Sequence, residues 1–394
     1  MKMISVEGAK QVILQSVPTK KTNAIQLSEA FGLVISEDII ATVDIPNFAQ
    51  SSMDGYALKF SDKNETLTVV GEMAAGTSHQ IKINDGEAAR IFTGAPLPES
   101  ADTVVMQEKI HLENNKLTLQ DENLTKGLNV RDKGAEVKAG ELAMAKDTYV
   151  SAAAVGFLAG IGCSEVSVYT PPKVAVILTG NELQEPGNPL EFGQVYESNS
   201  FQLKAALRQT GIKNIEIFKA EDDPDILQNV LDNALRNNDI VLLNGGVSVG
   251  DYDFVTKAAN ACGVEEKFHK IKQKPGKPLY FGTKDQKLVF GLPGNPSSSL
   301  TCFYEYVLPA LEALMGLPSR LIATKAKATH DYKKLPGLTH FLKAFYINGN
   351  VTPLHAQESF RLHSFAQANC LIVLPEESMG CIAGDEVTVH LLPI

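Results

Sequence analysis

One repeated pattern dominates the middle of the chain: a short apolar strand, a loop and an amphipathic helix. Residues 174–178 and 240–243 are continuous apolar runs of strand length, and residues 224–237 place apolar side chains at helical spacing. Parallel strands need long crossover connections, which are usually helices. Residues 174–316 are therefore predicted to form a doubly wound parallel α/β sheet covered by helices on both faces.

Both flanks of this α/β region have a different pattern. The pattern of residues 24–33 predicts a helix. Residues 41–140 are rich in short segments in which apolar and polar residues alternate, including a predicted hairpin over residues 110–119. Residues 151–162 predict a second, small-residue helix. After residue 318 the chain turns β-rich again, with Asn348-Gly349 as a hairpin turn. We expect a multidomain protein of mixed α/β and β class.

Charge and cysteine content narrow the functional classes. The formal net charge of −10 argues against a general nucleic-acid or anionic-membrane surface. The 5 cysteines form no CxxC pair, and the most apolar run, residues 152–163, is too short to span a bilayer. The first 20 residues lack the apolar core of a signal peptide. A protein of the reducing cytoplasm is expected.

Three glycine-bearing loops follow predicted strands, at residues 179–183, 244–253 and 291–298. In open α/β sheets, ligands bind outside the carboxyl ends of the strands. Glycine lets the backbone approach a ligand closely, and exposed amides at a following helix favour phosphate. A single such loop is more simply a turn, but three at one sheet edge predict a binding site.

Carboxylates cluster at the same predicted edge: Glu182, Asp222, Asp223, Asp251 and Asp253. Magnesium prefers a few hard oxygen ligands together with water and substrate phosphates. Asp223 precedes Pro224 and an apolar helix, so we interpret it as an N-cap, and Asp251 has the same alternative. Asp222 and Asp253 have no such alternative and are the candidate metal ligands.

Two further features suggest anion binding and a constrained acid. Lys274 and Lys277 lie in a Lys-Pro-Gly-Lys-Pro turn, where prolines fix two ammonium groups as a candidate oxyanion site, whereas residues 267–272 predict a solvated basic face. Asp54 begins an Asp-Gly turn and Thr93 begins a Thr-Gly-Ala-Pro loop. Taken singly, both segments are ordinary turns.

Six segments of the chain together resemble the molybdopterin molybdenumtransferase family, which includes the catalytic domain of gephyrin. They occur in the family's order: PNFAQSSMDGYA at residues 46–57, TGAPLPESADTVVMQE at 93–108, TGNEL at 179–183, GGVSVGDYDF at 245–254, KPGKP at 274–278 and GLPGNP at 291–296. The resemblance covers essentially the whole chain.

The resemblance implies four domains, with a central molybdopterin-binding α/β domain and a small C-terminal β-barrel. The expected boundaries are residues 22–40 with 141–171 for a linking domain, 41–140 for a β-rich domain, 1–21 with 172–318 for the α/β domain, and 319–394 for the barrel. It also implies a homodimer, with transient contacts to the adenylylating enzyme and to molybdoenzymes.

The implied reaction inserts molybdate into adenylylated molybdopterin and releases AMP with the help of Mg²⁺. By resemblance, the catalytic residues are Asp54, Thr93, Glu182, Asp222 and Asp253, of which Asp222 and Asp253 hold the metal. The implied substrate-binding residues are Gly245, Gly246, Ser248, Gly250, Asp251, Lys274, Lys277, Pro293, Gly294, Asn295, Pro296, Ser297, Ser298, Lys343 and Ser364. Cleavage of a phosphoanhydride requires charge neutralisation on its phosphates, which a metal ion supplies.

Some positions depart from the family, and other functions stay open. Asn181 stands where many members have Asp, Asn244 where Ser or Thr is common, and Glu136 where the family has Asp. Lys343 replaces an expected Arg, with Arg361 as a possible substitute; Lys lacks the planar fork of Arg. The alternatives are a ligand-binding scaffold on the same fold, an insertase for tungstate, and the adenylylating partner enzyme, although that smaller protein lacks the β-rich regions.

Overall fold

The structure, a computed structural model, describes residues 3–247 and 254–393. The chain divides into two compact units. The first comprises Met1–Asn23, Gly32–Val34 and Val168–Ile394, and the second comprises Ala24–Phe31 and Ile35–Ser167. The four predicted domain boundaries are finer than this division and stay a prediction.

A six-stranded sheet forms the centre of the first unit, in the order β16-β13-β17-β21-β20-β18. Its strands are β13 (Val174–Thr179), β16 (Ile215–Ala220), β17 (Ile240–Asn244), β18 (Glu265–His269), β20 (Tyr280–Lys284) and β21 (Lys287–Leu292). The first four in spatial order are parallel, as predicted, whereas β20 pairs antiparallel with both of its neighbours, β21 and β18. The sequence-based prediction missed this edge because the polar residues of β18 alternate with few apolar ones.

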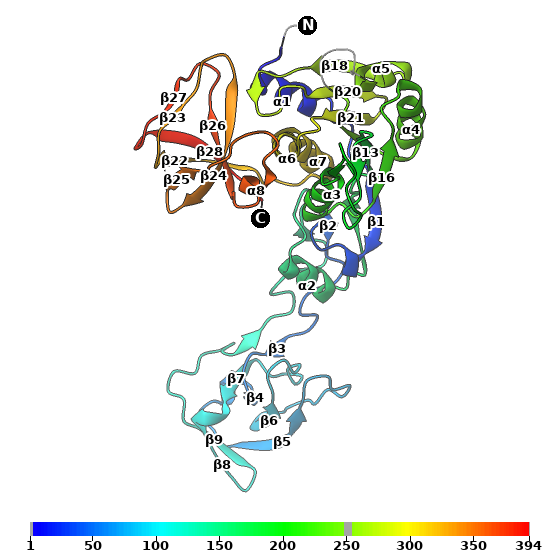
Figure 1. Cartoon of the computed structure of the whole chain (residues 1–394). Helices are drawn as coiled ribbons and strands as arrows, with labels where there is room; N and C mark the ends of the chain where they lie inside the picture. Colours follow the sequence, from blue (N-terminus) through cyan, green and yellow to red (C-terminus); the bar gives the residue numbers. More distant parts are fainter. Residues whose placement is uncertain (1–2, 248–253, 394) are drawn as a thin grey trace. The chain divides into compact units, whose positions relative to one another are not determined.

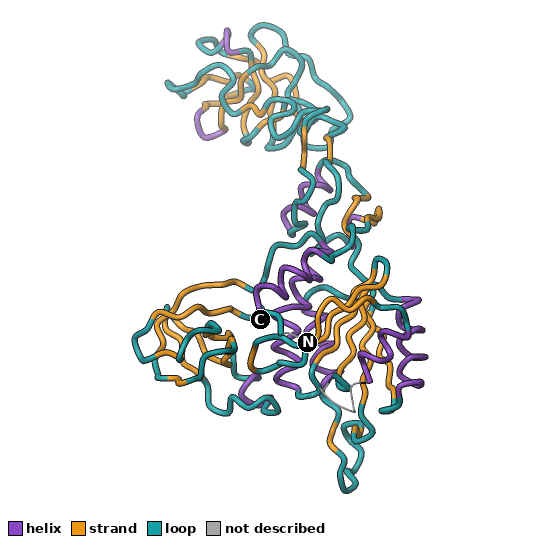
Figure 2. The backbone as a smooth tube through the Cα atoms, turned by 90° about the horizontal axis from the view of Figure 1, so that it is seen from above, coloured by secondary structure: helices purple, strands orange, loops and turns teal. Residues whose placement is uncertain are grey.

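Helices cover both faces of this sheet (Figures 1 and 2). The helices α4 (Pro224–Asn237) and α5 (Phe254–Ala261) pack on one face through Leu227, Leu231 and Val255. The opposite face carries α1 (Val6–Gln15), α3 (Asn199–Gln209), α6 (Pro296–Cys302), the π-helical turn η4 (Phe303–Val307) and α7 (Leu308–Met315). The doubly wound prediction is confirmed.

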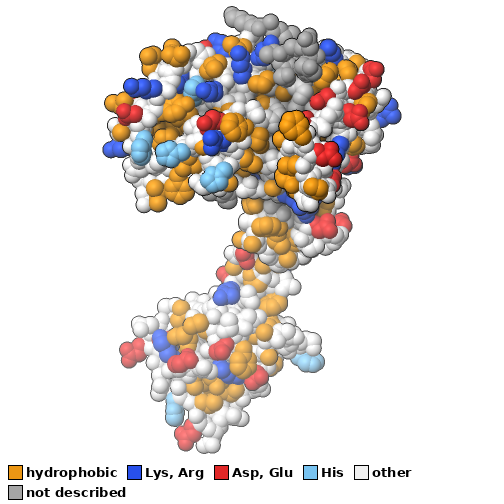
Figure 3. Space-filling model, in the orientation of Figure 1, with side chains coloured by type: hydrophobic (Ala, Val, Ile, Leu, Met, Phe, Trp, Pro, Cys, Tyr) orange, Lys and Arg blue, Asp and Glu red, His pale blue; other side chains and the backbone are white. Residues whose placement is uncertain are grey.

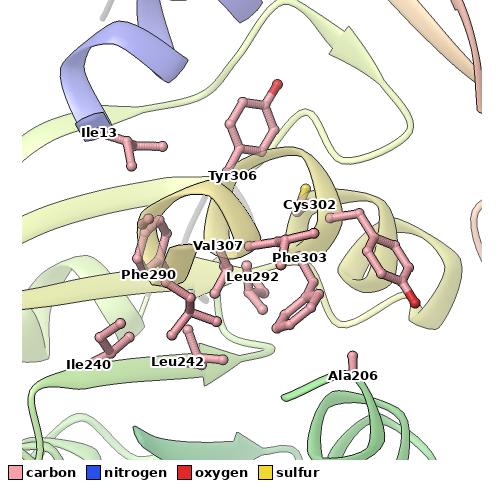
Figure 4. Close-up of a cluster of buried hydrophobic side chains, with 14 of the residues drawn as sticks. Ile13, Ala206, Ile240, Leu242, Phe290, Leu292, Cys302, Phe303, Tyr306 and Val307 are labelled. Atoms are coloured by element: carbon pink, nitrogen blue, oxygen red, sulfur yellow. The ribbon is translucent and has the colours of Figure 1, made fainter. Parts of the chain in front are cut away.

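The larger core lies between the sheet and this second group of helices. Figure 4 shows Phe290 and Leu292 of β21 facing Phe303 and Val307, with Leu242 of β17 beside them. All five side chains are fully buried. Burial of an apolar side chain of this size contributes about 1.5–3 kcal/mol, so this cluster fixes how the glycine loops are placed at the strand ends.

An ionised cluster inside this core joins α1, the π-helical turn and the C-terminal sheet. Glu305 is fully buried, and its carboxylate accepts from Lys10 Nζ at 2.5 Å and from His390 Nδ1 at 2.8 Å. Burial alone would raise the pKa of Glu305, but these two partners hold the pKa below its usual value. Glu305 is therefore ionised and satisfied.

The C-terminal part of the first unit is a second six-stranded sheet, in the order β19-β24-β25-β22-β28-β26. Its strands are β19 (Gln273–Lys274), β22 (Ile322–Ala328), β24 (Thr339–Ile347), β25 (Asn350–Pro353), β26 (Cys370–Leu374) and β28 (Glu386–Leu391). An additional β24–β26 pairing closes the sheet, which confirms the small barrel. Asn348 and Gly349 have positive φ at the predicted hairpin turn.

Short elements complete this unit. They are β14 (Leu183–Gln184) paired with β15 (Val195–Tyr196), β23 (Tyr332–Lys333) paired with β27 (Gly380–Cys381), and α8 (Leu362–Phe365). The strand β14 directly follows the first glycine loop, so the chain leaves the end of β13 and turns back across it.

The second unit is mainly β. Its main sheet has the order β7-β4-β6-β5-β9-β8. The strands are β4 (Gly55–Leu58), β5 (Leu67–Met73), β6 (Glu87–Ile91), β7 (Thr103–Met106), β8 (Ile110–Glu113) and β9 (Lys116–Leu119). The pairing of β8 with β9 confirms the predicted hairpin.

One predicted helix flanking this sheet is wrong and one is confirmed. Residues 24–33 form β1 (Thr22–Gln26) and the 3-10 turn η1 (Leu27–Glu29) instead of a helix, because the segment pairs with β12 (Glu165–Tyr169). The helix α2 (Ala152–Gly160) begins at an N-cap, Ser151, as expected. The other short elements are β2 (Ile39–Ile40), β3 (Gln50–Ser51), β10 (Val130–Arg131), β11 (Leu142–Met144), η2 (Phe60–Asp62) and η3 (Gln107–Lys109).

No helix in the described ranges has the length and apolar character needed to cross a membrane. On the face drawn in Figure 3, acidic and basic side chains are interspersed.

Candidate functional site

The carboxyl ends of the parallel strands surround one cavity of about 680 Å³, here called the carboxylate cavity. Glu182 follows β13, Asp222 follows β16, and Gly245 and Gly246 follow β17. The loop after β21 completes the wall with Pro293, Gly294, Asn295 and Pro296. The structure thus brings eight of the predicted site residues together around this cavity.

The glycines of this cavity are required by close packing of the backbone. Gly245 has φ +95°, and a Cβ there would lie 2.6 Å from Thr179 Oγ1 and 2.9 Å from the Thr179 carbonyl oxygen. Gly246 also has positive φ, at +63°. L-residues with a side chain rarely adopt this conformation. The second glycine loop is therefore pressed against the first, at the place where the backbone faces the cavity.

The carboxylates of this cavity separate into a cap and candidate ligands. Asp223 is the N-cap of α4, since its Oδ1 accepts from the backbone amides of Asp225 and Ile226, which confirms its structural interpretation. Asp222 is exposed, and its backbone N–H donates to Asn181 Oδ1 at 3.3 Å. Within the described part of the chain, the Asp222 and Glu182 carboxylates have no ion-pair partner.

Four predicted site residues, Ser248, Gly250, Asp251 and Asp253, lie outside the described residues. In the ranges that are described, no group of three or more His, Cys, Asp or Glu side chains has metal-binding geometry. Magnesium needs fewer protein ligands, because it keeps several waters and binds substrate phosphates. A solvent-facing carboxylate such as Asp222, beside a wall of backbone amides, fits that requirement.

A buried amide, Asn244, holds the loops of the carboxylate cavity together. Its Nδ2 donates to Ser299 Oγ at 2.8 Å and to the Pro293 carbonyl at 3.2 Å, and its Oδ1 accepts from Asn199 Nδ2 at 2.6 Å. The Asn199 amide also donates to the Gly294 carbonyl at 2.8 Å. Hydroxyl residues at this position would make fewer of these bonds, so Asn244 positions the loop after β21.

A second cavity of about 720 Å³, here called the lysine cavity, contains the predicted oxyanion residues Lys274, Lys277 and Ser298. Both ammonium groups are on exposed side chains, and Ser298 is buried. Gly276, between the lysines, has φ +88°, and a Cβ there would lie 2.6 Å from Cys302 Sγ. The Lys-Pro-Gly-Lys turn is therefore seated directly on α6.

The segment 356–361, here called the wall loop, lines the lysine cavity with its residues 356–360. Lys343 is 2% exposed, and its Nζ donates to the carbonyls of Ala356 at 2.8 Å, Arg361 at 2.9 Å and Glu358 at 3.3 Å. Burial lowers the pKa of Lys343. An ammonium group has three protons, so the carbonyls of the wall loop occupy all the donors of this lysine.

Ser364 has a similar position. It is buried, and its Oγ donates to the carbonyls of Ala356 at 2.8 Å and Arg361 at 3.2 Å. The predicted substitute, Arg361, pairs with Glu358 at 3.2 Å. Ser297 is buried under the wall loop and donates its N–H to the Ser359 carbonyl at 3.1 Å. Direct substrate contacts of Lys343, Ser364 and Ser297 stay predictions; each of the three donates a hydrogen bond to a carbonyl of the wall loop.

Sequence reasoning missed two residues of the lysine cavity, His340 and Phe360. Burial, with help from Lys334 and Lys274, lowers the pKa of His340 to about 4, so this imidazole is neutral at pH 7. Phe360 is 61% exposed at the cavity wall. Neither residue lies in one of the six matching segments, and an isolated His or Phe carries no signal of its own.

In the second unit, Asp54 and Thr93 form a pair. Asp54 Oδ1 accepts from both the Thr93 backbone N–H and the Thr93 Oγ1, each at 2.7 Å. The hydrogen bond from the Thr93 backbone N–H is the largest cause that lowers the pKa of Asp54, and the bond from the Thr93 hydroxyl lowers this pKa further. Arg90 donates to the Gly55 carbonyl at 2.7 Å and lies over the Tyr56 and Phe92 rings. The two segments interpreted singly as turns therefore hold one ionised carboxylate in a fixed orientation.

Comparison with known proteins matches three family models along the chain. Residues 4–162 match the MoeA N-terminal region (domain I and II), residues 175–313 a probable molybdopterin binding domain, and residues 325–392 the MoeA C-terminal region (domain IV). The fold and the cavity at its strand ends thus define a multidomain α/β protein with a molybdopterin-binding type of central domain.

Relatives over the full length specify the family. The molybdopterin molybdenumtransferase of Haemophilus influenzae is 35% identical, covering 99% of this chain and 100% of the relative, and that of Nostoc sp. is 34% identical, covering 100% and 94%. A crystal structure of the molybdopterin biosynthesis MoeA protein from Pyrococcus horikoshii aligns with a TM-score of 0.87 at 31% identity, covering 99% of both chains. The chain belongs to the molybdopterin molybdenumtransferase family and is an enzyme of molybdenum cofactor biosynthesis.

Proposed function

We propose that this enzyme inserts molybdate into adenylylated molybdopterin and releases AMP in a Mg²⁺-dependent reaction. The observation that carries the proposal is the adjacency of two chemically different cavities, one with carboxylates and glycine amides and one with two exposed lysines. Pro278, Pro293, Asn295 and Phe360 line both cavities. A substrate that carries a diphosphate and accepts a metal oxyanion suits such a pair.

On this proposal, the carboxylate cavity binds the diphosphate. The backbone near Gly245, Gly246 and Gly294 allows phosphate oxygens to approach closely. Asp222, with Asp253, would hold Mg²⁺, which supplies charge neutralisation on the two phosphates when bound. Glu182 is proposed to orient water or the departing phosphate in this cavity, because it presents a carboxylate with free lone pairs. The Asp54–Thr93 pair is proposed as a separate catalytic element of the second unit.

The lysine cavity is proposed to bind molybdate. Lys274 and Lys277 supply two positive charges for a dianion, and Ser298 supplies a hydroxyl donor. Tungstate has similar size and charge, so the same donors suit it; competition of tungstate against molybdate in AMP release separates the two. The wall loop lines the same cavity.

The test is AMP release from adenylylated molybdopterin with molybdate and magnesium. Asp222→Asn is expected to slow release by about 100-fold, because a neutral amide binds Mg²⁺ poorly. Asp223→Ser is the matched control, since it removes a neighbouring charge while keeping an N-cap residue; it should leave the rate within about 2-fold. Absence of AMP release by the unmodified enzyme, or equal rates in both variants, would contradict the proposal.

We also propose a cytoplasmic homodimer that contacts the adenylylating enzyme and molybdoenzymes transiently. The support is family membership. Light scattering of the purified chain checks the dimer, since a monomeric mass of 42.6 kDa would contradict it.

A further inference from the structure

Phe360 is an exposed aromatic residue at the walls of two cavities of the first unit. Its side chain is 61% exposed, whereas Phe341 and Phe365, on the strand and helix beside the wall loop, are 2% and 4% exposed. It lines both the carboxylate cavity and the lysine cavity. An aromatic ring left in water at a cavity wall gains free energy when an apolar or planar partner covers it.

The surface shared by the two cavities is mostly apolar. Besides Phe360 it consists of Pro278, Pro293 and Asn295. Neither proline nor phenylalanine presents a charged group, so the charged residues lie on either side of this shared wall: Asp222 in one cavity and Lys274 in the other. A molecule that reaches both charged ends passes along the shared wall.

The backbone that carries Phe360 is fixed from several directions. Lys343 and Ser364 bind the carbonyls of Ala356 and Arg361. The residue before Phe360 is also held, because Ser359 Oγ accepts from Asn295 Nδ2 at 2.9 Å and its carbonyl accepts from Ser297. A ring on a fixed backbone loses little conformational entropy on binding, which favours a stacking role.

We propose that Phe360 stacks on the pterin ring of adenylylated molybdopterin and thereby aligns the substrate across the two cavities. This inference rests on the proposed function. The substrate's diphosphate belongs in the carboxylate cavity, and its sulfurs must face the oxyanion in the lysine cavity. The pyran ring carries both those sulfurs and the phosphate arm, so this ring and the pterin fused to it then lie at the shared wall. The Arg361 guanidinium lies over the Phe360 ring, 5.5 Å from its centroid, and stabilises it by a cation–π contact.

The experiment compares Phe360→Ala with Phe360→Tyr, which keeps the ring. Aromatic stacking on a planar heterocycle corresponds to a change of about 10-fold in affinity. Phe360→Ala should therefore weaken binding of adenylylated molybdopterin, and raise its KM, by about 10-fold, with kcat nearly unchanged. Binding of AMP alone, which lacks the pterin, should not change, and Phe360→Tyr should behave as the unmodified enzyme. Because the side chain is exposed, both variants should keep the unmodified Tm.

Three results would overturn the inference. Equal affinity of Phe360→Ala and the unmodified enzyme for adenylylated molybdopterin shows that the ring makes no contact. An equal loss of AMP affinity places the ring against adenine instead. If the unmodified enzyme neither binds adenylylated molybdopterin nor releases AMP, the proposed function itself fails and this inference fails with it.

Discussion

The two cavities of the first unit are built by different means. The carboxylate cavity is formed at strand ends, where the buried parallel strands of the central sheet fix each loop and glycines allow the loops to touch. The wall loop of the lysine cavity has no strand or helix of its own over residues 356–361, and buried side chains from β24 and α8 hold its carbonyls. Backbone geometry therefore maintains one site, and side-chain hydrogen bonds maintain much of the other.

The largest effect is expected from a change of backbone geometry in the carboxylate cavity. Gly245→Ala places a methyl group against Thr179 at a positive φ and should reduce the free energy of unfolding by about 3 kcal/mol. Gly263→Ala is the control, because its φ of +74° is also positive but a Cβ there meets no atom within 4 Å. Urea unfolding of both variants measures the difference; equal losses would show that close packing at Gly245 is unimportant.

A somewhat smaller effect is expected when the side-chain support of the wall loop is removed. Lys343→Met keeps the length of the side chain but removes three hydrogen bonds to wall-loop carbonyls, of which the Glu358 carbonyl has no side-chain donor besides Lys343 among the described residues, so stability should fall by about 2 kcal/mol. Molybdate binding should weaken as well, because the cavity wall is no longer fixed. Titration with molybdate and thermal unfolding check both effects. A variant with unchanged stability but lost binding would instead favour direct contact between Lys343 and the oxyanion.

Ser364→Ala tests the same support with one hydroxyl. The Oγ donates to two wall-loop carbonyls, so its removal should cost about 1 kcal/mol of stability. Ser378→Ala, which also removes a hydroxyl bonded to backbone at residue Gly380, is a control outside the wall loop. Only Ser364→Ala should weaken molybdate binding. Equal weakening of molybdate binding in both variants would show that the wall loop has no specific role at the oxyanion site.

The last effect concerns pH. Because the folded protein lowers the pKa of His340 to about 4, the unfolded chain takes up a proton between pH 6.5 and 4 that the folded chain does not. Stability should therefore fall as the pH decreases through this window. His340→Gln should flatten part of that fall, as measured by Tm at pH 7 and pH 5. An unchanged slope would show that His340 titrates normally.

Much of the carboxylate cavity was predictable from the sequence, and much of the lysine cavity was not. Glycine loops after apolar strands can be recognised in the sequence as candidate binding loops, because ligands bind at the carboxyl ends of the strands in any open α/β sheet. The N-cap role of Asp223 followed from Pro224 and the apolar helix behind it. His340 and Phe360 gave no comparable signal, because each acquires its role from residues distant in the sequence.

The sequence by itself determined the alternation of strands and helices, the turns at glycine and Asn-Gly, and the family, because these depend on local spacing and on segments read in order. Tertiary structure alone decided the antiparallel strands β18 and β20, the pairing of residues 22–26 with β12, and the burial of Lys343 beneath the wall loop. In each of these cases the stabilising partner is a backbone group outside the segment itself, on a neighbouring strand, on β12 or in the wall loop. Local propensity carries no information about such a partner.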